Sequence, residues 1–262
     1  MVQLTVASLN TRGMPLRGSR LGERYAAIGA VFEASDVDVV NFQEVLTYYH
    51  LRQLVRAMPS YRFVSFRRSV AGPAGGLLTL SRTAIARIDY THFPLPAAAD
   101  VVGLPRLSRQ QARLKGVLVT HLAGVAVLNT HLLANFDGDW SETNRYYRLQ
   151  HQQLTTLAHA VAALDKPAVI TGDFNLASNS PLYRTFIQDT GLLNAFGDNC
   201  PPTFHASYLR SNQSPHCIDF LLLSDSSITV KTTQLTFTGP LPMPGGHDYL
   251  TDHLGLQAHL TL

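Results

Sequence analysis

The six residues Ile170-Thr171-Gly172-Asp173-Phe174-Asn175 join a buried strand to a polar turn. The apolar run Ala168-Val169-Ile170 predicts a short buried strand, which ends where Gly172 allows a turn to begin. Side chains two residues apart in an extended chain point to the same side, so Asp173 and Asn175 can face one small target. A carboxylate beside a carboxamide suits a cation and an anionic group held side by side, although an ordinary polar turn shows the same pattern.

The composition is that of a globular protein with a large core. Of the 262 residues, 45% are apolar and 15% are charged, and no linker, composition shift or repeat divides the chain. We therefore expect a single domain over residues 1–262, and we expect it to be a monomer. The net charge of +3 at pH 7 is too small to require a nucleic acid as partner.

Two observations bear on the compartment. Residues 2–9 are short and alternating, so neither a signal peptide nor a membrane-spanning segment is visible. This predicts a cytoplasmic protein, or a secreted one if a leader was removed. Cys200 and Cys217 form no C-x-x-C motif; they could pair in a disulfide, although nothing in the sequence requires it.

The periodicity of apolar residues predicts more strands than helices, in an α/β fold with two mixed β-sheets packed face to face and helices outside. Residues 94–110 and 239–248 are rich in proline and predict loops. Helices are predicted at residues 21–34, 47–57 and 145–164 and from Ser180-Pro181 onward. Strands are predicted at residues 2–9, 37–42, 61–66, 77–80, 85–93, 112–122, 125–128, 168–170, 217–223, 228–237 and 254–262.

Polar side chains recur where the predicted strands end. In a sandwich of two sheets, strand ends from distant parts of the chain can meet at one rim, where acids, amides and histidines would make a site for a cation and a phosphate. A further carboxylate, Asp219, lies in an apolar strand and is costly there unless paired; we expect His253 as its partner. The strand ends carry Asn10, Gln43-Glu44, Asn129-Thr130-His131, Asp173 with Asn175, and Asp252-His253.

The residue types at these strand ends suit metal-assisted phosphoryl chemistry. Glu44 offers a hard oxygen ligand for Mg²⁺ or Mn²⁺. His131 can protonate a leaving oxygen, and the imidazole of His253 can bind or protonate a phosphoryl oxygen. No cysteine or histidine spacing matches a zinc site. Taken one at a time, His131 also fits a structural histidine, and Glu44 also fits a solvated loop acid.

Six motifs, taken in order, resemble one known family. The set resembles the endonuclease/exonuclease/phosphatase superfamily, whose members include deoxyribonucleases, abasic-site endonucleases, neutral sphingomyelinases and inositol polyphosphate phosphatases. The resemblance covers nearly the whole chain, and it implies a four-layer α/β sandwich and a metal-dependent phosphodiesterase or phosphatase. The motifs are Leu9-Asn10, Phe42-Gln43-Glu44-Val45, Asn129-Thr130-His131-Leu132, Gly172-Asp173-Phe174-Asn175, Ile218-Asp219-Phe220 and Thr251-Asp252-His253-Leu254.

The resemblance implies a metal site and a group that acts on water. Glu44 would bind a catalytic Mg²⁺, for which Mn²⁺ could substitute. Asn10 would lie beside Glu44 as a further ligand, and Asp252 would lie near the metal. Asp173 would either activate the attacking water or sit on the metal, and the resemblance leaves both roles open.

The remaining matches imply contacts to the substrate. Asn175 would hold the scissile phosphate, and Asn10 would lie close to it. His253, oriented by Asp219, would stabilise the negative charge that develops on phosphorus. His131 would face the leaving group, as the histidine does in deoxyribonucleases and sphingomyelinases. The reaction implied is an in-line attack of water on phosphorus.

The identity of the substrate depends on the loops. The Thr-His-Leu motif and the absence of a strongly basic face are similar to neutral sphingomyelinases and favour a lipid headgroup or another small phosphodiester. Loops 93–107 and 241–244 are candidate membrane contacts or ordinary packing loops. A nuclease of the deoxyribonuclease type is the alternative, because several arginines could line a groove. An inositol or other small-molecule phosphatase and an inactive binding module are further alternatives. The arginines are Arg67, Arg68, Arg106, Arg109 and Arg113.

Overall fold

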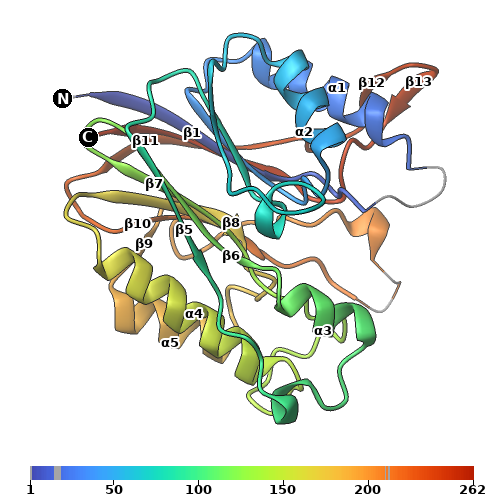
Figure 1. Ribbon diagram of the computed structural model, residues 1–262, viewed down its shortest axis with the longest axis vertical. Helices are drawn as coiled ribbons and strands as arrows, with labels where there is room; N and C mark the ends of the chain where they lie inside the picture. The colour runs from blue at the N-terminus through green and yellow to red at the C-terminus, as the bar shows by residue number, and fades with distance from the viewer. Residues whose placement is uncertain (1, 15–18, 210, 212) are drawn as a thin grey trace.

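Two six-stranded mixed sheets lie face to face in a computed structural model that describes residues 2–14, 19–209, 211 and 213–262 (Figure 1). In each sheet two neighbouring strands are parallel and the other pairs are antiparallel. The first sheet has the order β11 (Thr229–Thr236), β14 (Gly255–Thr261), β1 (Gln3–Asn10), β2 (Val39–Gln43), β4 (Leu78–Ser81), β3 (Phe63–Ser65). The second has the order β5 (Arg87–His92), β6 (Gly116–His121), β7 (Ala126–His131), β8 (Ala168–Asp173), β10 (Asp219–Leu223), β9 (Leu193–Asn194).

Helices cover the outer face of each sheet and complete a four-layer α/β sandwich (Figure 1). Helices α1 (Leu21–Glu33) and α2 (Tyr48–Ala57) lie over the first sheet, and α4 (Tyr147–Ala162) and α5 (Pro181–Thr190) over the second. Three short 3₁₀ turns are η1 (Ala74–Gly76), η2 (Ala98–Val101) and η3 (Ala206–Tyr208). No helix of the described ranges is long and apolar enough to cross a membrane. The architecture expected from the sequence is therefore confirmed.

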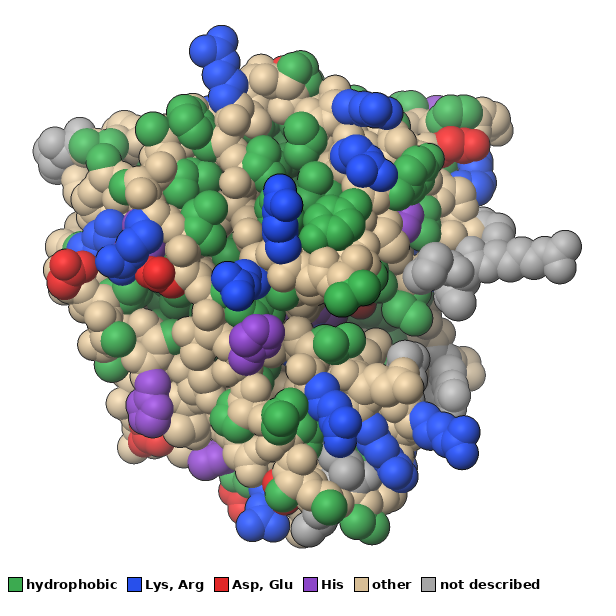
Figure 2. All heavy atoms as spheres, viewed as in Figure 1, with side chains coloured by type: hydrophobic (Ala, Val, Ile, Leu, Met, Phe, Trp, Pro, Cys, Tyr) green, Lys and Arg blue, Asp and Glu red, His purple; other side chains and the backbone are tan. Residues whose placement is uncertain are grey.

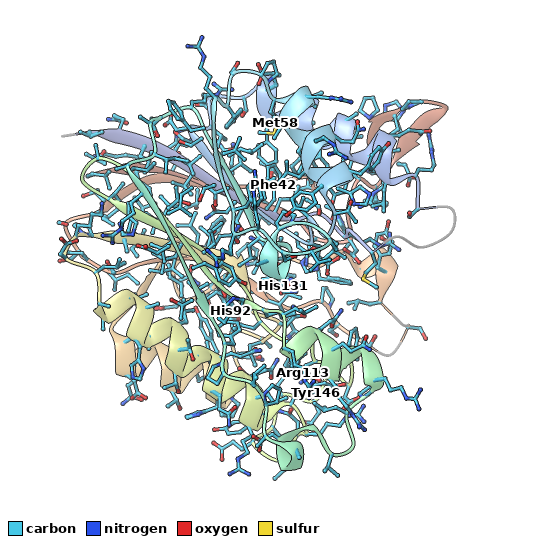
Figure 3. The ribbon with its side chains drawn as sticks, viewed as in Figure 1. Phe42, Met58, His92, Arg113, His131 and Tyr146 are labelled. Carbon is cyan, nitrogen blue, oxygen red and sulfur yellow. A yellow bond between two sulfur atoms is a disulfide. The ribbon has the colours of Figure 1, made fainter. Side chains whose placement is uncertain are left out.

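Three apolar layers hold the sandwich together. One lies between the first sheet and its helices, where Phe42 and Met58 are fully buried (Figure 3). A second lies between the other sheet and α4 and α5, with Phe174 and Phe220 at its centre. The third lies between the two sheets and is made mostly of valine and leucine. Burying these side chains supplies the main driving force for folding.

On the face between the sheets, the side chains of several strands are apolar along most of the strand and polar at its end, and the polar ends form the site. In β8, Val169 belongs to the apolar layer between the sheets, whereas Thr171 and Asp173 follow on the same face because strand side chains alternate. Strands β1, β2 and β7 repeat the pattern, with Asn10 and His131 at the polar end. The polar ends of the strands from both sheets therefore meet at one rim of the sandwich.

A close approach between β7 and β8 explains the glycine before Asp173. A Cβ atom built on Gly172 would lie 2.0 Å from the carbonyl oxygen of Thr130. Only glycine allows the two parallel strands to approach so closely. The pairing sets Thr130 opposite Gly172 and His131 opposite Asp173. Gly172 thereby helps to bring the two polar strand ends together.

Two segments predicted as loops contain regular structure. Residues 94–110 include η2 and the start of helix α3 (Arg106–Ala112), where Leu104, Ser108 and Ala112 are buried at intervals of four. The serine in the middle of this row and the surrounding prolines hid the helical period. Residues 239–248 contain a hairpin of β12 (Leu241–Met243) and β13 (Gly246–Asp248), and its two-residue turn is Pro244-Gly245, where the glycine has a positive φ of 89°.

A disulfide between Cys200 and Cys217 closes the long loop that leads into β10. The two Cα atoms are 5.9 Å apart, and 17 positions separate the residues in sequence. This loop contains Thr203, which contacts Asp219, and Phe204, which pairs with His253 in an isolated bridge. The disulfide therefore limits the freedom of a loop that touches the site.

Replacing Cys200 by serine should lower the free energy of unfolding by about 3 kcal/mol, because a closed loop of this length removes entropy from the unfolded chain. Urea unfolding with and without dithiothreitol measures the effect. Dithiothreitol should destabilise the wild type by a similar amount and leave Cys200→Ser unchanged. Equal stability of the wild type and Cys200→Ser without reductant would contradict the expectation.

Candidate active site

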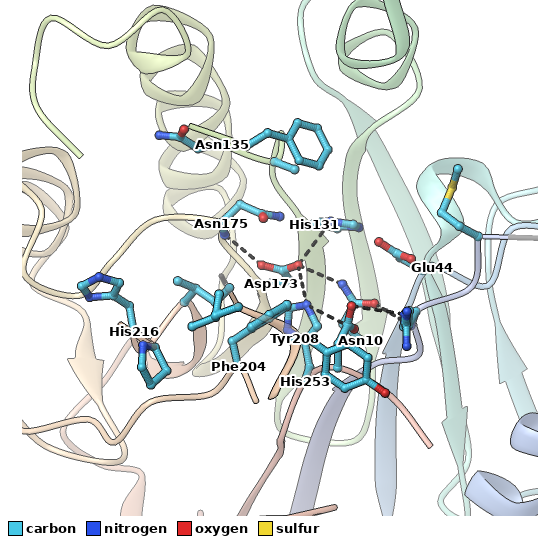
Figure 4. Close-up of a pocket in the computed structure, with 18 of the residues that line it drawn as sticks. Asn10, Glu44, His131, Asn135, Asp173, Asn175, Phe204, Tyr208, His216 and His253 are labelled. Atoms are coloured by element: carbon cyan, nitrogen blue, oxygen red, sulfur yellow. Dashed lines mark hydrogen bonds and ion pairs between the residues drawn. The ribbon is translucent and has the colours of Figure 1, made fainter. Parts of the chain in front are cut away.

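The polar strand ends open into a pocket of about 1250 Å³ at the rim between the two sheets. Of the residues given a catalytic, metal or substrate role from the sequence, all but Asp219 line this pocket, and Asp219 lies directly behind His253. Three other polar residues at the strand ends, Gln43, Asn129 and Thr130, do not line it. Figure 4 shows the labelled side chains converging from both sheets. The lining residues from the sequence prediction are Asn10, Glu44, His131, Asp173, Asn175, Asp252 and His253.

Asp173 is the centre of the pocket's hydrogen-bond network (Figure 4). Its Oδ2 accepts a hydrogen bond from Asn10 Nδ2 at 2.9 Å and lies 3.4 Å from His131 Nε2 and 3.8 Å from His253 Nε2. Its Oδ1 accepts the backbone N–H of Asn175 at 2.9 Å. Both histidines, an amide and a carboxylate from four separate segments therefore surround one small volume.

Asn175 reaches the pocket through a turn and not through an extended strand. Its φ of 51° is left-handed, so the simple alternation between Asp173 and Asn175 does not apply. The side-chain Nδ2 donates to the carbonyl of Leu132 at 3.2 Å. Both residues still line the pocket, as the sequence predicted, but they arrive with different backbone geometry.

His253 is held by the partner expected for it. Its Nδ1 lies 2.9 Å from Asp219 Oδ2 and 3.1 Å from Oδ1. Thr203 donates from Oγ1 to Asp219 Oδ2 at 2.6 Å, which fixes the carboxylate in turn. The ring of Phe204 packs edge-on against the imidazole at 5.0 Å between centroids. The Nε2 of His253 is thus directed into the pocket toward Asp173.

Burial and charge shift the proton equilibria of this cluster. Burial, together with the nearby charge of Asp219, raises the pKa of Asp173 to about 7. For His253, burial opposes the charged form, but the Asp219 and Asp173 carboxylates outweigh it and raise its pKa well above the usual value. Burial and the neighbouring Lys115 hold the pKa of His131 well below the usual range. One histidine therefore favours the charged state and the other the neutral state.

Glu44 occupies an unusual backbone position at the end of β2. Its φ of 63° is left-handed, and its Oε2 accepts the backbone N–H of Gly13 at 2.9 Å. A Cβ on Gly13 would lie 1.7 Å from the carbonyl oxygen of Glu44, so only glycine fits there. This contact turns the Glu44 carboxylate toward the pocket, on the side of Asp173 away from His216 (Figure 4).

Two groups of side chains could hold a cation. Ligand atoms of Asp173, Asp219 and His253 lie within 4.8 Å of one another. However, Asp219 already accepts from His253 and Thr203, so this trio is better described as a hydrogen-bonded acid–histidine pair facing a second acid. Glu44 is only partly buried, and it fits Mg²⁺, which prefers one or two carboxylates and keeps several waters.

Lys115 is a site residue that the sequence prediction missed. It precedes β6, is 5% exposed and lines the pocket, and its Nζ donates to the carbonyl of Leu132 at 2.7 Å. Burial lowers its pKa to about 8, although Asp173 and Glu44 act in the opposite direction. A single lysine before an apolar strand carries no signal in the sequence. Its position at the pocket follows only from the fold, which sets its ammonium near Asp173 and Glu44.

Replacing Lys115 by methionine should lower kcat/KM for a phosphodiester by roughly 10- to 150-fold, because a hydrogen bond to a charged group contributes about 1.5–3 kcal/mol. In the wild type, kcat/KM should fall as pH rises through about 8, where Lys115 loses its charge. Lys115→Met should lose the part of that fall that comes from Lys115 and keep the part that comes from His253, and pH profiles measure both effects. Lys166→Met is a matched control, because Lys166 also donates to a backbone carbonyl but lies outside the pocket. An unchanged alkaline limb in Lys115→Met would contradict the assignment.

A protein-family model shows to which family the chain belongs. The model named Endonuclease/Exonuclease/phosphatase family matches residues 7–253. The chain belongs to this family. Its members share the fold described above, and the chain is therefore related to metal-dependent phosphoesterases. No curated protein matches the sequence.

Solved structures with the same fold carry different activities in their names. The D. rerio protein TDP2 complexed with a single-strand DNA product is similar with a TM-score of 0.75, 16% identity and 100% coverage of both chains. Sphingomyelinase C from Streptomyces griseocarneus has a TM-score of 0.69, 18% identity and 99% coverage of both chains. A mannosyl-6-phosphatase from Bacteroides thetaiotaomicron has a TM-score of 0.72 and 19% identity, covering 99% of this chain and 100% of that one. At these identities the likeness concerns the fold alone.

Proposed function

We propose that this family member is a Mg²⁺-dependent phosphodiesterase that hydrolyses a small phosphodiester by in-line attack of water. The observation that carries the proposal is the contact of Asp173 with Asn10, His131 and His253 in a buried pocket beside Glu44. These groups can hold a metal ion, a phosphate and a water molecule at one place. An inactive binding module would have no need of two buried histidines with opposite charge preferences.

The roles of the acids follow from their surroundings. Glu44 and Asn10 would hold the Mg²⁺, with Asp252 nearby, and the bound ion would supply positive charge next to the phosphoryl oxygens. Asp173, with its pKa raised to about 7, is suited to accept the proton of the attacking water near neutral pH. Asp219 accepts the Nδ1–H of the imidazole and orients it.

The two histidines would act on different oxygens. His253 favours the imidazolium form, so it would stabilise the negative charge that develops on the phosphoryl oxygens. His131 favours the neutral form and would donate a hydrogen bond toward the leaving oxygen. Asn175 would hold a phosphoryl oxygen through its amide. Each of these site residues therefore has one proposed role in the reaction.

The two loops considered as membrane contacts differ in how much apolar surface they expose. In the 241–244 hairpin Met243 is buried and Leu241 packs on the core beside α1, so this loop offers little apolar surface. In the 93–107 loop Leu95 and Val102 are 75% and 74% exposed and could contact a lipid surface. The substrate proposed is therefore a small phosphodiester, either free or presented as a lipid headgroup.

A nucleic acid is the second candidate substrate. Arg106, Arg109 and Arg113 follow one another along the exposed side of α3, and cationic side chains gather in this region in Figure 2. Gln111 of this helix and Lys115, three residues after its end, line the pocket. A row of arginines can follow a phosphate backbone, so this surface favours a polyanionic chain whose end or bend enters the pocket.

Hydrolysis of bis-p-nitrophenyl phosphate with Mg²⁺, and its loss in EDTA with recovery on adding Mg²⁺ or Mn²⁺, tests the proposal directly. We expect metal removal to abolish measurable turnover. A panel at matched Mg²⁺ containing sphingomyelin micelles, plasmid DNA, abasic DNA and inositol phosphates then identifies the substrate class. Full activity in EDTA, or no hydrolysis with any divalent metal, would refute the enzyme assignment.

The compartment is a separate proposal. We infer an oxidising compartment, because the Cys200–Cys217 disulfide forms and persists more readily there than in a reducing cytosol. The cytoplasmic location expected from the sequence stays a prediction. Thiol labelling of the protein in freshly lysed source cells distinguishes the two, because only a cytosolic protein would expose two alkylatable cysteines.

A further inference from the structure

Ring side chains from two loops form one wall of the pocket. Trp140 comes from the segment after β7, and His216 comes from the disulfide-closed loop before β10. Their ring centroids are 5.8 Å apart at an interplanar angle of 76°, and both side chains line the pocket. The contact joins two loops that each lead to or from a strand with a site residue. This wall is thus continuous with the site but is not used by the proposed reaction.

Phe136 lies four residues before Trp140 in the same segment and is held outside the core by its neighbours. It lines the pocket and is 58% exposed. Asn135 explains the exposure, because its Oδ1 accepts the N–H of Asp137 at 3.1 Å and its Nδ2 donates to the carbonyl of Asp139 at 2.7 Å. These bonds make a local turn that presents Phe136 outward. An aromatic face presented to a pocket offers a large apolar contact to a ligand.

The acid on this wall is already paired and is not free to bind a cationic ligand. Asp137 is bound by Arg145 through two hydrogen bonds of 2.7 and 2.6 Å, so its negative charge is already paired. The apolar surface comes largely from rings and not from flexible aliphatic chains. Flat aromatic faces suit a flat ring, which can stack on them; they can also attract a quaternary ammonium, and the phosphocholine arm of the experiment below distinguishes the two.

The position of the wall places it within the reach of a group attached to the reacting phosphate. In Figure 4, His216 lies on the side of Asp173 opposite Glu44, and Asn135 lies beyond Asn175. A phosphate held between the Glu44 side and Asn175 would therefore direct one of its substituents toward the rings. We propose that Phe136, Trp140 and His216 form a subsite for a planar ring of the nucleobase type carried by the phosphodiester. The proposal rests on the proposed function and narrows its substrate.

The chain contains a single tryptophan, which makes the subsite directly observable. Adenosine 5′-monophosphate and ribose 5-phosphate share a sugar and a phosphate and differ by the ring, and phosphocholine represents a lipid headgroup. The affinity of each is measured with Mg²⁺ by calorimetry and by Trp140 fluorescence. We expect the nucleotide to bind roughly 5- to 150-fold more tightly than ribose 5-phosphate, because stacking of a base on an aromatic side chain contributes about 1–3 kcal/mol. Binding of the nucleotide should also change the Trp140 emission.

Two variants assign the preference to this wall. Phe136→Ala removes an exposed ring and should bring the affinity for the nucleotide close to that for ribose 5-phosphate, and His216→Ala should do the same in part. Tyr49→Ala is the matched control, because Tyr49 is 52% exposed and lies outside the pocket. Equal affinities for the two ligands in the wild type, a preference for phosphocholine, or an unchanged preference in Phe136→Ala would each overturn the subsite.

The binding and hydrolysis experiments test the subsite and the proposed reaction independently of each other. A ring preference without any diester hydrolysis would refute the proposed reaction and support the subsite. Diester hydrolysis without a ring preference would support the reaction and refute the subsite.

Discussion

Alanine in place of His253 should lower the turnover of bis-p-nitrophenyl phosphate by at least ~100-fold at saturating Mg²⁺. The imidazole is buried, bonded to Asp219 at 2.9 Å, and has a pKa raised by two carboxylates. Its loss removes a positive charge aimed at the phosphoryl oxygens, and water cannot replace it with the same orientation. A steady-state assay of the purified variant measures the loss, and thermal unfolding verifies that the fold is retained.

A second variant of the same pair shows that the charge of the imidazole is what matters. Asp219→Asn keeps the shape of the side chain but removes the carboxylate that stabilises the imidazolium, so the pKa of His253 should fall. Because the charged form is the active one in the proposed reaction, the alkaline limb of kcat should move to lower pH. A His253→Ala enzyme with a rate near that of the wild type would refute the role of the imidazole.

Glutamine in place of Glu44 should also lower turnover by at least ~100-fold, because the neutral amide is a poor ligand for Mg²⁺. The change is nearly isosteric, and the hydrogen bond from Gly13 can persist, so the left-handed backbone at this position need not change. Part of the loss should be recovered at high Mg²⁺, because the expected defect is in metal affinity. A metal titration of activity and calorimetric binding of Mn²⁺ measure the two effects separately.

Asp165→Asn is the matched control for that experiment, since Asp165 is an exposed acid just beyond the end of α4 and outside the pocket. It should bind Mn²⁺ and turn over substrate as the wild type does. Wild-type Mn²⁺ affinity in Glu44→Gln would remove Glu44 from the metal site and direct attention to the Asp173, Asp219 and His253 cluster.

Much of the fold could be predicted because the period of apolar residues survives packing. The strand at Ala168–Asp173 begins as an apolar run and ends at Gly172-Asp173, and the sequence therefore indicates both the buried strand and the polar end that bears Asp173. Helix α3 and the β12–β13 hairpin were missed, because their stability comes from distant contacts and glycine turns and not from a local period. Short elements of this kind depend on tertiary packing.

In the site, too, some features could be predicted from the sequence and others could not. The pairing of Asp219 with His253 could be predicted, because a carboxylate buried in an apolar strand needs a partner. The buried position of Lys115 could not, because no residue near it in sequence distinguishes it from a surface lysine. The meeting of Trp140 with His216 could not be predicted either, since it requires two loops to come together. The catalytic roles themselves stay predictions until the variants are measured.

The two sheets contribute different halves of the chemistry, and polar contacts between them set how those halves align. Gln43 donates to Asn129 at 2.8 Å, and Asn41 donates to Thr171 at 2.8 Å, in each case from the first sheet to the second. Aliphatic packing is not directional, whereas a hydrogen bond requires a defined distance and angle between its partners. These hydrogen bonds therefore fix the position of one sheet relative to the other. As a result, Glu44 on the first sheet and Asp173 on the second keep a constant relative position, whatever the conformation of the loops around them.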